Sequence, residues 1–541
     1  MRNIILVSLL FCFSLACGES ERECISLDGA WKIAFDENNK SRNETWYMPK
    51  SFSDLEHLES IDVPSCWETI RKDYEGVAVY GKKFKVPSEW ENKAIRLHFD
   101  AVNYRADVWL NGYAVGQHEG GYGPFEFQVD DLIKVEETNF LSVRVLGPIV
   151  NQDKIIDGLG KNDAPHWRGA IAGGIWQSVK LIASGQVFID DLFIIPNINE
   201  NKANIQLSLN NSGLNKCTHE VIVEVKDKDS GSVVSRKSRN IVLQPGKKIT
   251  KWSMPIPNAK HWSPKSPNLY EVKAIIVKQD NESHHFGMRE LTIKNEEFIL
   301  NGEPIYIKAA FFEGLYPTKL ALPDSREMAI KEIQLAKEAG FNMIRPWRKP
   351  PPKMWLDLCD EMGMMVVGGL PIECMKLWPT VTPEMPSRIE NEVRSAILRD
   401  RNRACIVQWE MFNEIWRKEL KRLKHKMSMI ARELDPSRLI LDESGGFADG
   451  ANIYLPYEVE PITFNDVHIY CGYPINNLTY SQFLALGMNK EEMEKLGYEA
   501  SELENKHTSP GKMTLVSEIG YGSVPDLKKN NRLFKERGNP L

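Results

Sequence analysis

The chain has 541 residues, 42% of them hydrophobic and 9% aromatic, so it is too long for one hydrophobic core and predicts roughly three to four domains. Its formal net charge of -6 provides no basic field for a polyanion, which argues against nucleic acid as a partner. Nine cysteines occur without Cys-x-x-Cys spacing, which argues against a zinc site and against a dense disulfide framework.

The N-terminus predicts export. It reads MRNIILVSLLFCFSLACGES, with one positive residue, an apolar run too short to span a bilayer, and then small residues, as in a secretory signal. The segment SLAC resembles a bacterial lipobox, which implies that residues 1–17 are a signal peptide and that Cys17 is lipidated. The alternative is cleavage nearby with Cys17 left as a free thiol. We therefore expect a protein of the periplasm or cell surface, held to the outer membrane only by a lipid anchor.

Two blocks of short strands follow. Residues 24–184 predict a jelly roll or another all-β sandwich, since runs such as AIRLHFDAV and FLSVRVLG are separated by turn residues. Asn111-Gly112 lies between two such runs and indicates a hairpin. Residues 185–293 contain ANIQLSLNNS, HEVIVEVKDKDSG and YEVKAIIVKQD, whose spacing is typical of an immunoglobulin-like sandwich.

From residue 294 to residue 541, apolar runs alternate with helices. This alternation predicts parallel strands joined by right-handed crossovers, in a doubly wound sheet or a (β/α)₈ barrel. No glycine-rich nucleotide fingerprint follows any strand, which favours the TIM barrel. The expected strands after the first, in FILNGEPIYIKAAFF, lie at 341–347, 364–370, 405–412, 438–443, 466–470 and 514–519, and the expected helices at 325–339, 353–362, 386–400 and 417–434.

The predicted barrel has seven strands and lacks its last one. The segment after Glu518 is long enough for a loop and a helix but not for an eighth strand. An open barrel leaves unpaired strand edges and an exposed apolar interior. We therefore expect a fragment of a longer protein, a barrel completed from elsewhere, or an impaired copy.

Two glutamates end predicted barrel strands. Glu414 closes the fourth strand in IVQWEMFNEIW, and Glu518 closes the seventh in TLVSEIGYG. Strand ends of a barrel open on one face, so the two carboxylates can meet although about a hundred positions separate them. A separation of about 5 to 5.5 Å suits a retaining glycoside hydrolysis, with one nucleophile and one acid/base. Each glutamate alone could be a helix cap or a surface residue, and it is the pairing that favours a site.

The whole layout resembles glycoside hydrolase family 2, whose members include β-galactosidases, β-glucuronidases and β-mannosidases. The motifs that carry the resemblance are LDGAWKIAFD, VPSCWE, VWLNG, GGIWQSVKL, FILNGEPIYIKAA, GFNMIR, CIVQWEMFNE and LVSEIG. The resemblance implies a retaining, exo-acting β-glycosidase in a bacterial lipoprotein form, with a terminal β-galactoside or β-glucuronide of an oligosaccharide or glycan as the favoured substrate. The two-glutamate mechanism requires no metal and no cofactor.

The resemblance also implies roles for single residues. Glu414 would be the acid/base and Glu518 the nucleophile, and Asn413 would bind the sugar 2-hydroxyl. Arg345 would steady the charge of the nucleophile, and Tyr470 would donate to the same carboxylate. A salt-bridging residue on the barrel rim is the alternative for Arg345, and a packed aromatic is the alternative for Tyr470.

Further residues remain open. His468 is expected near the substrate, although its side chain is interpreted as packed or in a supporting position. Glu373 after strand three either lines the pocket or is a solvated loop carboxylate. The stretch RPWRKPPP departs from the family pattern, and its Arg348 and Lys349 either meet a uronate carboxylate or, the favoured interpretation, are solvated loop charges.

A rival hypothesis is a carbohydrate-binding lipoprotein that has lost turnover because its barrel is incomplete. The sequence leaves the oligomeric state and the sugar undecided.

Overall fold

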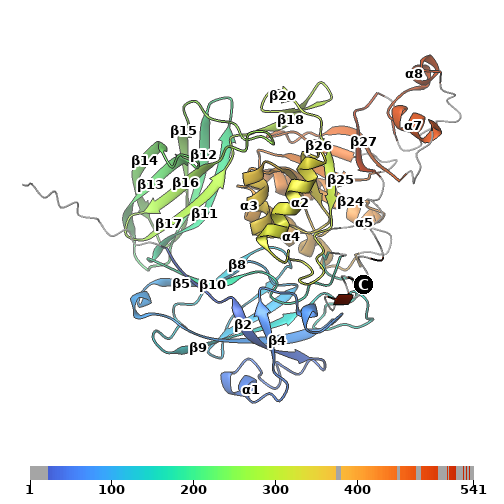
Figure 1. The fold of residues 1–541 in the computed structure, drawn as a ribbon. Helices are drawn as coiled ribbons and strands as arrows, with labels where there is room; N and C mark the ends of the chain where they lie inside the picture. The colour runs from blue at the N-terminus through green and yellow to red at the C-terminus, as the bar shows by residue number, and fades with distance from the viewer. Residues whose placement is uncertain are drawn as a thin grey trace, which may run out of the picture.

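The structure is a computed structural model that divides into three parts along the chain (Figure 1). It describes residues 22–167, 169–372, 379–446, 451–470, 477–497, 508–509, 511–519, 528, 532 and 535–536. The predicted signal peptide with Cys17, and the candidate residue Glu373, lie outside the described residues.

The first part consists of two antiparallel sheets around a shared core. One sheet has the order β3-β2-β4-β9-β6-β7 and the other β1-β10-β5-β8. The side chains between them include Trp31, Leu97 and Val143, all buried. Asn111 and Gly112 both have positive φ and join β6 to β7, as the hairpin prediction requires. The elements are β1 (Glu23–Ser26), β2 (Gly29–Asp36), α1 (Pro49–Ser53), β3 (Glu59–Val63), β4 (Val77–Lys85), β5 (Ala94–Phe99), β6 (Arg105–Leu110), β7 (Tyr113–Glu119), β8 (Phe125–Gln128), β9 (Thr138–Leu146) and β10 (Val179–Ser184).

The second part is a seven-stranded sandwich with sheet orders β11-β12-β15 and β14-β13-β16-β17. Its strands alternate inward apolar residues with outward polar ones, which produces one core between two antiparallel sheets. The strands are β11 (Val187–Asn197), β12 (Lys202–Asn211), β13 (Cys217–Asp227), β14 (Val233–Leu243), β15 (Gly246–Pro255), β16 (Tyr270–Ile276) and β17 (Asp280–Phe286). The small sheet β18 (Leu291–Lys294), β19 (Glu297–Leu300) and β20 (Glu303–Pro304) leads into the third part.

The third part is a curled sheet of eight strands with helices between them. Helix starts and ends follow local chemistry. Ser325 caps α2 by accepting from the Met328 N–H, Gly340 follows α2 with φ 86°, and Gly363 ends α3 with φ 68°. The elements are β21 (Ala309–Phe312), α2 (Arg326–Glu338), β22 (Met343–Pro346), α3 (Lys353–Met362), β23 (Met365–Gly369), α4 (Met385–Asp400), β24 (Ile406–Asn413), α5 (Lys418–Lys421), α6 (Leu423–Leu434), β25 (Leu439–Ser444), β26 (Ala451–Tyr454), β27 (Ile462–Ile469), α7 (Asn477–Leu484), α8 (Lys490–Lys495) and β28 (Thr514–Ile519).

The strand β26 was not predicted. It pairs antiparallel with β25 and with β27, so the eight strands comprise seven parallel ones, as counted from the sequence, and one inserted strand. Its four residues, ANIY, are too few to show an alternating pattern by themselves. Among the described residues no pairing joins β28 to β21, so the sheet is open between its two end strands.

The first part packs tightly against α4 of the barrel. The Gly121 N–H donates to Glu392 Oε1 at 2.6 Å, and a Cβ at Gly123 would come within 2.3 Å of the Ser395 side chain. Burial raises the pKa of Glu392 to about 8, against hydrogen bonds from the backbone of Gly121 and Tyr122 that lower it. This contact fixes the helix that leads into β24. None of the described helices is long and apolar enough to cross a membrane.

Candidate active site

Glu414 follows directly after β24 and has a left-handed backbone conformation, with φ 47°. Such a conformation is costly for a residue with a side chain and needs support from its surroundings. Two hydrogen bonds to β25 provide it. The Glu414 N–H donates to the Ser444 carbonyl at 2.8 Å, and the Ile415 N–H donates to Glu443 Oε1 at 2.7 Å. Lys424 lies 2.9 Å from Glu443 and holds that carboxylate in turn.

Glu518 lies on β28, where the pairing with β27 is irregular. Val467 pairs with Val516 and His468 pairs with Glu518, so Ser517 has no partner on β27 and forms a bulge. A bulge lets two successive residues turn toward one side of a sheet. Glu518 accepts from Arg345 Nη1 at 2.7 Å through Oε1 and from the Tyr470 hydroxyl through Oε2.

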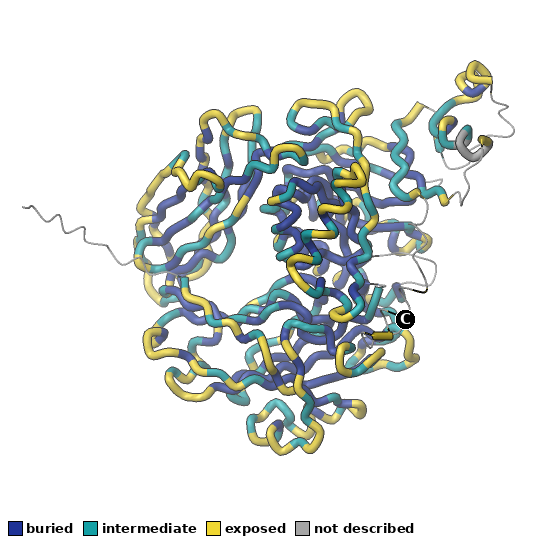
Figure 2. The backbone as a smooth tube through the Cα atoms, in the orientation of Figure 1, coloured by how far each residue is buried: buried dark blue, intermediate teal, exposed yellow. Residues whose placement is uncertain are grey.

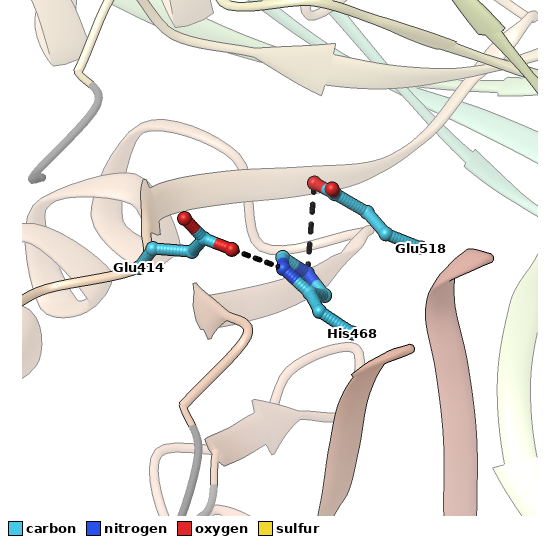
Figure 3. Close-up of side chains that lie close together, drawn as sticks. All are labelled: Glu414, His468 and Glu518. Atoms are coloured by element: carbon cyan, nitrogen blue, oxygen red, sulfur yellow. Dashed lines mark hydrogen bonds and ion pairs between the residues drawn. The ribbon is translucent and has the colours of Figure 1, made fainter. Parts of the chain in front are cut away.

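The two carboxylates face each other across His468 (Figure 3). His468 Nδ1 lies 2.7 Å from Glu414 Oε1, and its Nε2 lies 3.6 Å from Glu518 Oε1. One polar atom from each of the three side chains lies within 4.8 Å of the other two. Both glutamate side chains are 13% exposed, which leaves them reachable from solvent. Both histidine nitrogens are engaged, Nδ1 by Glu414 and Nε2 by Ser444.

Beneath this pair lies a buried ion cluster. Arg345 donates to both oxygens of Glu410, at 2.8 and 2.7 Å, and reaches Asn413 Oδ1 at 3.0 Å. Arg348 also donates to Glu410. Burial alone would favour the neutral form of Glu410, but Arg345 and Arg348 lower its pKa to about 2, and Glu410 with Glu518 raises the pKa of Arg345 against the effect of burial. The cluster therefore holds the Arg345 fork in one orientation toward Glu518.

Glu410 was missed in the sequence. It lies in the middle of β24, whose eight residues are all buried. The argument that singled out Glu414, that a carboxylate in an apolar run needs a reason, applies equally to Glu410.

The interpretation of Arg348 and Lys349 as solvated loop charges is wrong. Both are buried, at 1% and 2% exposure, because the segment packs inside the molecule. Arg348 is occupied by Glu410 and by the Ile372 carbonyl, at 2.8 Å for the latter. Lys349 Nζ lies 4.6 Å from the centre of the Trp167 ring, and burial lowers its pKa to about 8.

Asn413 is fully buried at the end of β24. Its Oδ1 accepts from Arg345, so the amide orientation is fixed, and its Nδ2 has no hydrogen-bond partner among the described residues. A buried amide donor without a partner is costly in a folded protein. This donor therefore has a hydrogen-bonding capacity that no described residue uses.

The structure brings together the predicted residues Arg345, Asn413, Glu414, His468, Tyr470 and Glu518. His468, interpreted as packed or supporting, lies directly between the two glutamates with a side chain only 1% exposed. The sequence offered no signal for this position apart from its place on the strand that also carries Tyr470.

Three family models match the chain in order. They are the sugar binding domain of glycosyl hydrolases family 2 over residues 69–184, glycosyl hydrolases family 2 over 187–289, and the family 2 TIM barrel domain over 291–518. The chain therefore belongs to family 2 of the glycosyl hydrolases.

Similar curated proteins are glycosidases of the same family. A β-galactosidase from Thermoanaerobacterium thermosulfurigenes is 28% identical over 452 residues, covering 78% of this chain and 60% of that protein. A β-glucuronidase from Paenibacillus borealis is 24% identical over 457 residues, covering 77% of this chain and 72% of that protein. The chain spans about half the length of most of the curated relatives it matches.

Solved structures give the same architecture. The β-glucuronidase of Bacteroides uniformis superimposes with a TM-score of 0.72 at 23% identity, covering 93% of this chain and 60% of that one. A β-glucuronidase from Ruminococcus gnavus superimposes with a TM-score of 0.65 at 22% identity, covering 77% of this chain and 72% of that one. At these identities the likeness establishes the fold.

Proposed function

We propose that the protein is a retaining β-glycosidase that removes terminal β-linked sugars from oligosaccharides or glycans by double displacement. The observation that carries this proposal is the approach of Glu414 and Glu518, with polar atoms within 4.8 Å of each other, in a site reachable from solvent. That approach is compatible with the separation of about 5 to 5.5 Å that retaining glycosidases use.

In the first step Glu518 attacks the anomeric carbon while Glu414 donates a proton to the leaving oxygen. The bond between the anomeric carbon and that oxygen breaks as the bond to Glu518 forms. Arg345 and Tyr470 both donate to Glu518, which orients the attacking carboxylate and balances its charge.

In the second step Glu414, now ionised, takes a proton from water, which attacks the anomeric carbon and releases Glu518. The Asn413 Nδ2, fixed by Arg345 and without a partner in the described part of the chain, is the donor that suits the 2-hydroxyl of the sugar. Hydrogen bonds to that hydroxyl strengthen in the transition state.

The test replaces each glutamate and follows the stereochemistry of rescue. Glu518→Ala and Glu414→Ala should both lose turnover of an aryl β-glycoside panel that includes galactoside, glucuronide and mannoside. Added azide should then give a β-configured glycosyl azide with Glu414→Ala, where it replaces water, and an α-configured one with Glu518→Ala, where it replaces the nucleophile. Glu433→Ala, an exposed site on α6, is the matched control. Unchanged turnover in either active-site variant would refute the mechanism.

For the sugar, we propose a β-galactoside or a β-glucuronide, because curated relatives of both activities match the chain at 28% and 24% identity. The buried Arg348 is already paired with Glu410, so a uronate would need another cation. Comparing kcat/KM for the aryl galactoside and the aryl glucuronide decides between them.

We also propose that the protein is exported and anchored by lipid at Cys17. Cell fractionation of the full-length protein and of Cys17→Ser tests this, since the variant should move from the membrane fraction to the soluble fraction. Membrane association that persists in Cys17→Ser would rule the anchor out.

A further inference from the structure

A continuous chain of hydrogen bonds runs from Glu414 to a buried aspartate that the mechanism does not use. His468 Nδ1 meets Glu414 at 2.7 Å, and His468 Nε2 meets the Ser444 hydroxyl at 3.0 Å. Ser444 donates to the Ser517 hydroxyl at 3.1 Å, and Ser517 donates to Asp466. Asp466 is 1% exposed and also accepts from the Gly445 N–H at 3.1 Å.

The bulge on β28 makes this chain possible. In regular pairing Ser517 and Glu518 would point to opposite faces of the sheet. Because Ser517 is the extra residue, its hydroxyl reaches Ser444 and Asp466 while Glu518 still reaches Arg345. The described strands β25, β27 and β28 each contribute at least one group to the network, and Glu414 joins it from the position that follows β24.

Each hydroxyl has a single proton, so the chain has a direction. Asp466 accepts from Ser517, which takes the Ser517 proton. Ser517 must then accept from Ser444, and Ser444 must accept from His468, so the histidine proton is on Nε2. In the neutral imidazole Nδ1 is then left as an acceptor, and the short contact with Glu414 requires a proton from the carboxylic acid.

The charged groups that act on Asp466 are few. Burial raises its pKa to about 6, against hydrogen bonding from Ser517, the charge of His468 and the Gly445 N–H, while Glu410 adds to the rise. His468 is on the same strand, Glu410 is on β24, and Glu518 faces the histidine from β28. In the structure Asp466 accepts from the Ser517 hydroxyl and from the Gly445 N–H.

We propose that Asp466, as the acceptor at the end of the chain through the hydroxyls of Ser517 and Ser444, fixes the His468 tautomer with its proton on Nε2 and so keeps the catalytic proton on Glu414. Asp466 and the two serines are positioning residues, since none of them touches the reacting atoms. The inference rests on the proposed role of Glu414 as the acid.

The first test reads the tautomer directly and needs no turnover. ¹⁵N NMR of histidine-labelled protein at pH 7.5 should show His468 protonated on Nε2, with its signals identified by comparison with His468→Gln, because the chain has 11 histidines. In Ser517→Ala the Ser444 hydroxyl is released and can donate to Nε2, so the form protonated on Nδ1 should appear. In Ser517→Thr the hydroxyl is kept and the tautomer should not change. An unchanged tautomer in Ser517→Ala would overturn the proposal.

The second test separates proton donation from general damage. In Ser517→Ala and Asp466→Asn, kcat/KM for an alkyl or phenyl glycoside should fall by about 10- to 100-fold, part of the 10²–10⁴ that general acids contribute. The 2,4-dinitrophenyl glycoside, whose leaving group needs no proton, should lose far less, and Ser517→Thr should recover the phenyl substrate. Ser142→Ala, a buried serine on β9 in the first part, is the control.

Equal losses for both leaving groups would assign the chain a structural role and contradict the inference. If the wild-type protein turned over no glycoside, the proposed function would fail, while the NMR result would still report the tautomer. The two failures are therefore distinguishable.

Discussion

The central and end strands of the barrel sheet differ in burial, by which Figure 2 colours the backbone, and they hold the two glutamates in different ways. Every residue of β22, β23, β24 and β25 is buried. The residues of β21 alternate between exposed and intermediate, and those of β28 are intermediate or exposed. Glu414 thus follows a buried central strand, and Glu518 lies on a partly exposed end strand.

This difference shows which contacts fix the position of each glutamate. The Glu414 position is set by the backbone, through hydrogen bonds to β25 at a strained residue. The Glu518 position is set by side chains that reach across the sheet, above all by Arg345 from β22. Substitutions of the reaching side chains should therefore damage the nucleophile before they damage the acid.

The largest effect is expected for Arg345→Met. After this change the buried Glu410 keeps only Arg348 as an ionic partner, and Glu518 loses its arginine. Breaking a buried ion pair costs about 3–5 kcal/mol. We expect unfolding in urea at lower concentration and loss of nearly all turnover. Arg394→Met on α4 removes a partly exposed pair with Glu390 and should change stability by less than about 1 kcal/mol. Wild-type activity in Arg345→Met would show that Arg345 is not needed to position Glu518.

Glu410→Gln should cost somewhat less and should show a defined pH signature. The pKa of Glu410 is lowered to about 2 in the folded protein, so its ionisation stabilises the fold above its ordinary pKa and that contribution is lost as pH falls toward 2. We expect the variant to be less stable than the wild type by about 2–3 kcal/mol at pH 7. Urea unfolding at pH 7 and at pH 3 should show this gap shrinking in acid; a constant gap would mean that charge is not the cause.

Asp466→Asn, on β27 next to the end strand β28, should show the opposite dependence of stability on pH. The pKa of Asp466 is raised to about 6, chiefly by burial, so the folded wild type keeps a proton that the unfolded chain releases between about pH 4 and 6. As the pH rises over that range the wild type loses stability and the Asp466→Asn variant does not. We expect the free energy of unfolding of Asp466→Asn to rise relative to that of the wild type by about 1–3 kcal/mol as the pH goes from 4 to 7, as measured by thermal unfolding. If the relative stability of the variant rose as the pH fell, the predicted direction of the pH dependence would be contradicted.

The smallest effect on stability is expected for Tyr470→Phe. Tyr470 is 44% exposed, so loss of its hydroxyl should change the free energy of unfolding by less than about 1 kcal/mol. Because the hydroxyl donates to Glu518, turnover should still fall, by about 10-fold or more for a lost charged hydrogen bond of 1.5–3 kcal/mol. Tyr457→Phe, another exposed tyrosine, provides the control for kcat. Equal kcat in the two variants would show that the hydroxyl does not support the nucleophile.

Sequence periodicity was sufficient for the regular elements of the barrel. Helix α3 begins and ends as predicted, and β28 does too, because apolar runs bounded by Gly or Pro mark their own limits. The strand β26 could not be predicted, since its four residues become a strand only through pairing with both neighbours. Tertiary context decided this element.

The predicted site residues converge because strand ends of such a sheet open on one face. The contacts of the supporting groups were beyond sequence reasoning. Glu410 pairs with arginines from a neighbouring segment, and Ser517 faces Ser444 only because a bulge shifts the register of β28 by one residue. Such contacts depend on which residues face each other, and no local pattern records that.

Gly121 and Gly123 limit how this architecture can recombine. A Cβ at Gly121 would come within 2.3 Å of Asn103, and one at Gly123 within 2.3 Å of Ser395 on α4. A jelly roll exchanged from a related protein would therefore seat on this barrel only with glycine at the position of Gly123 or with a matching change on α4, whereas Gly121 is needed within the first part itself. When members of the family exchange domains, we therefore expect the first domain and the barrel to be exchanged together.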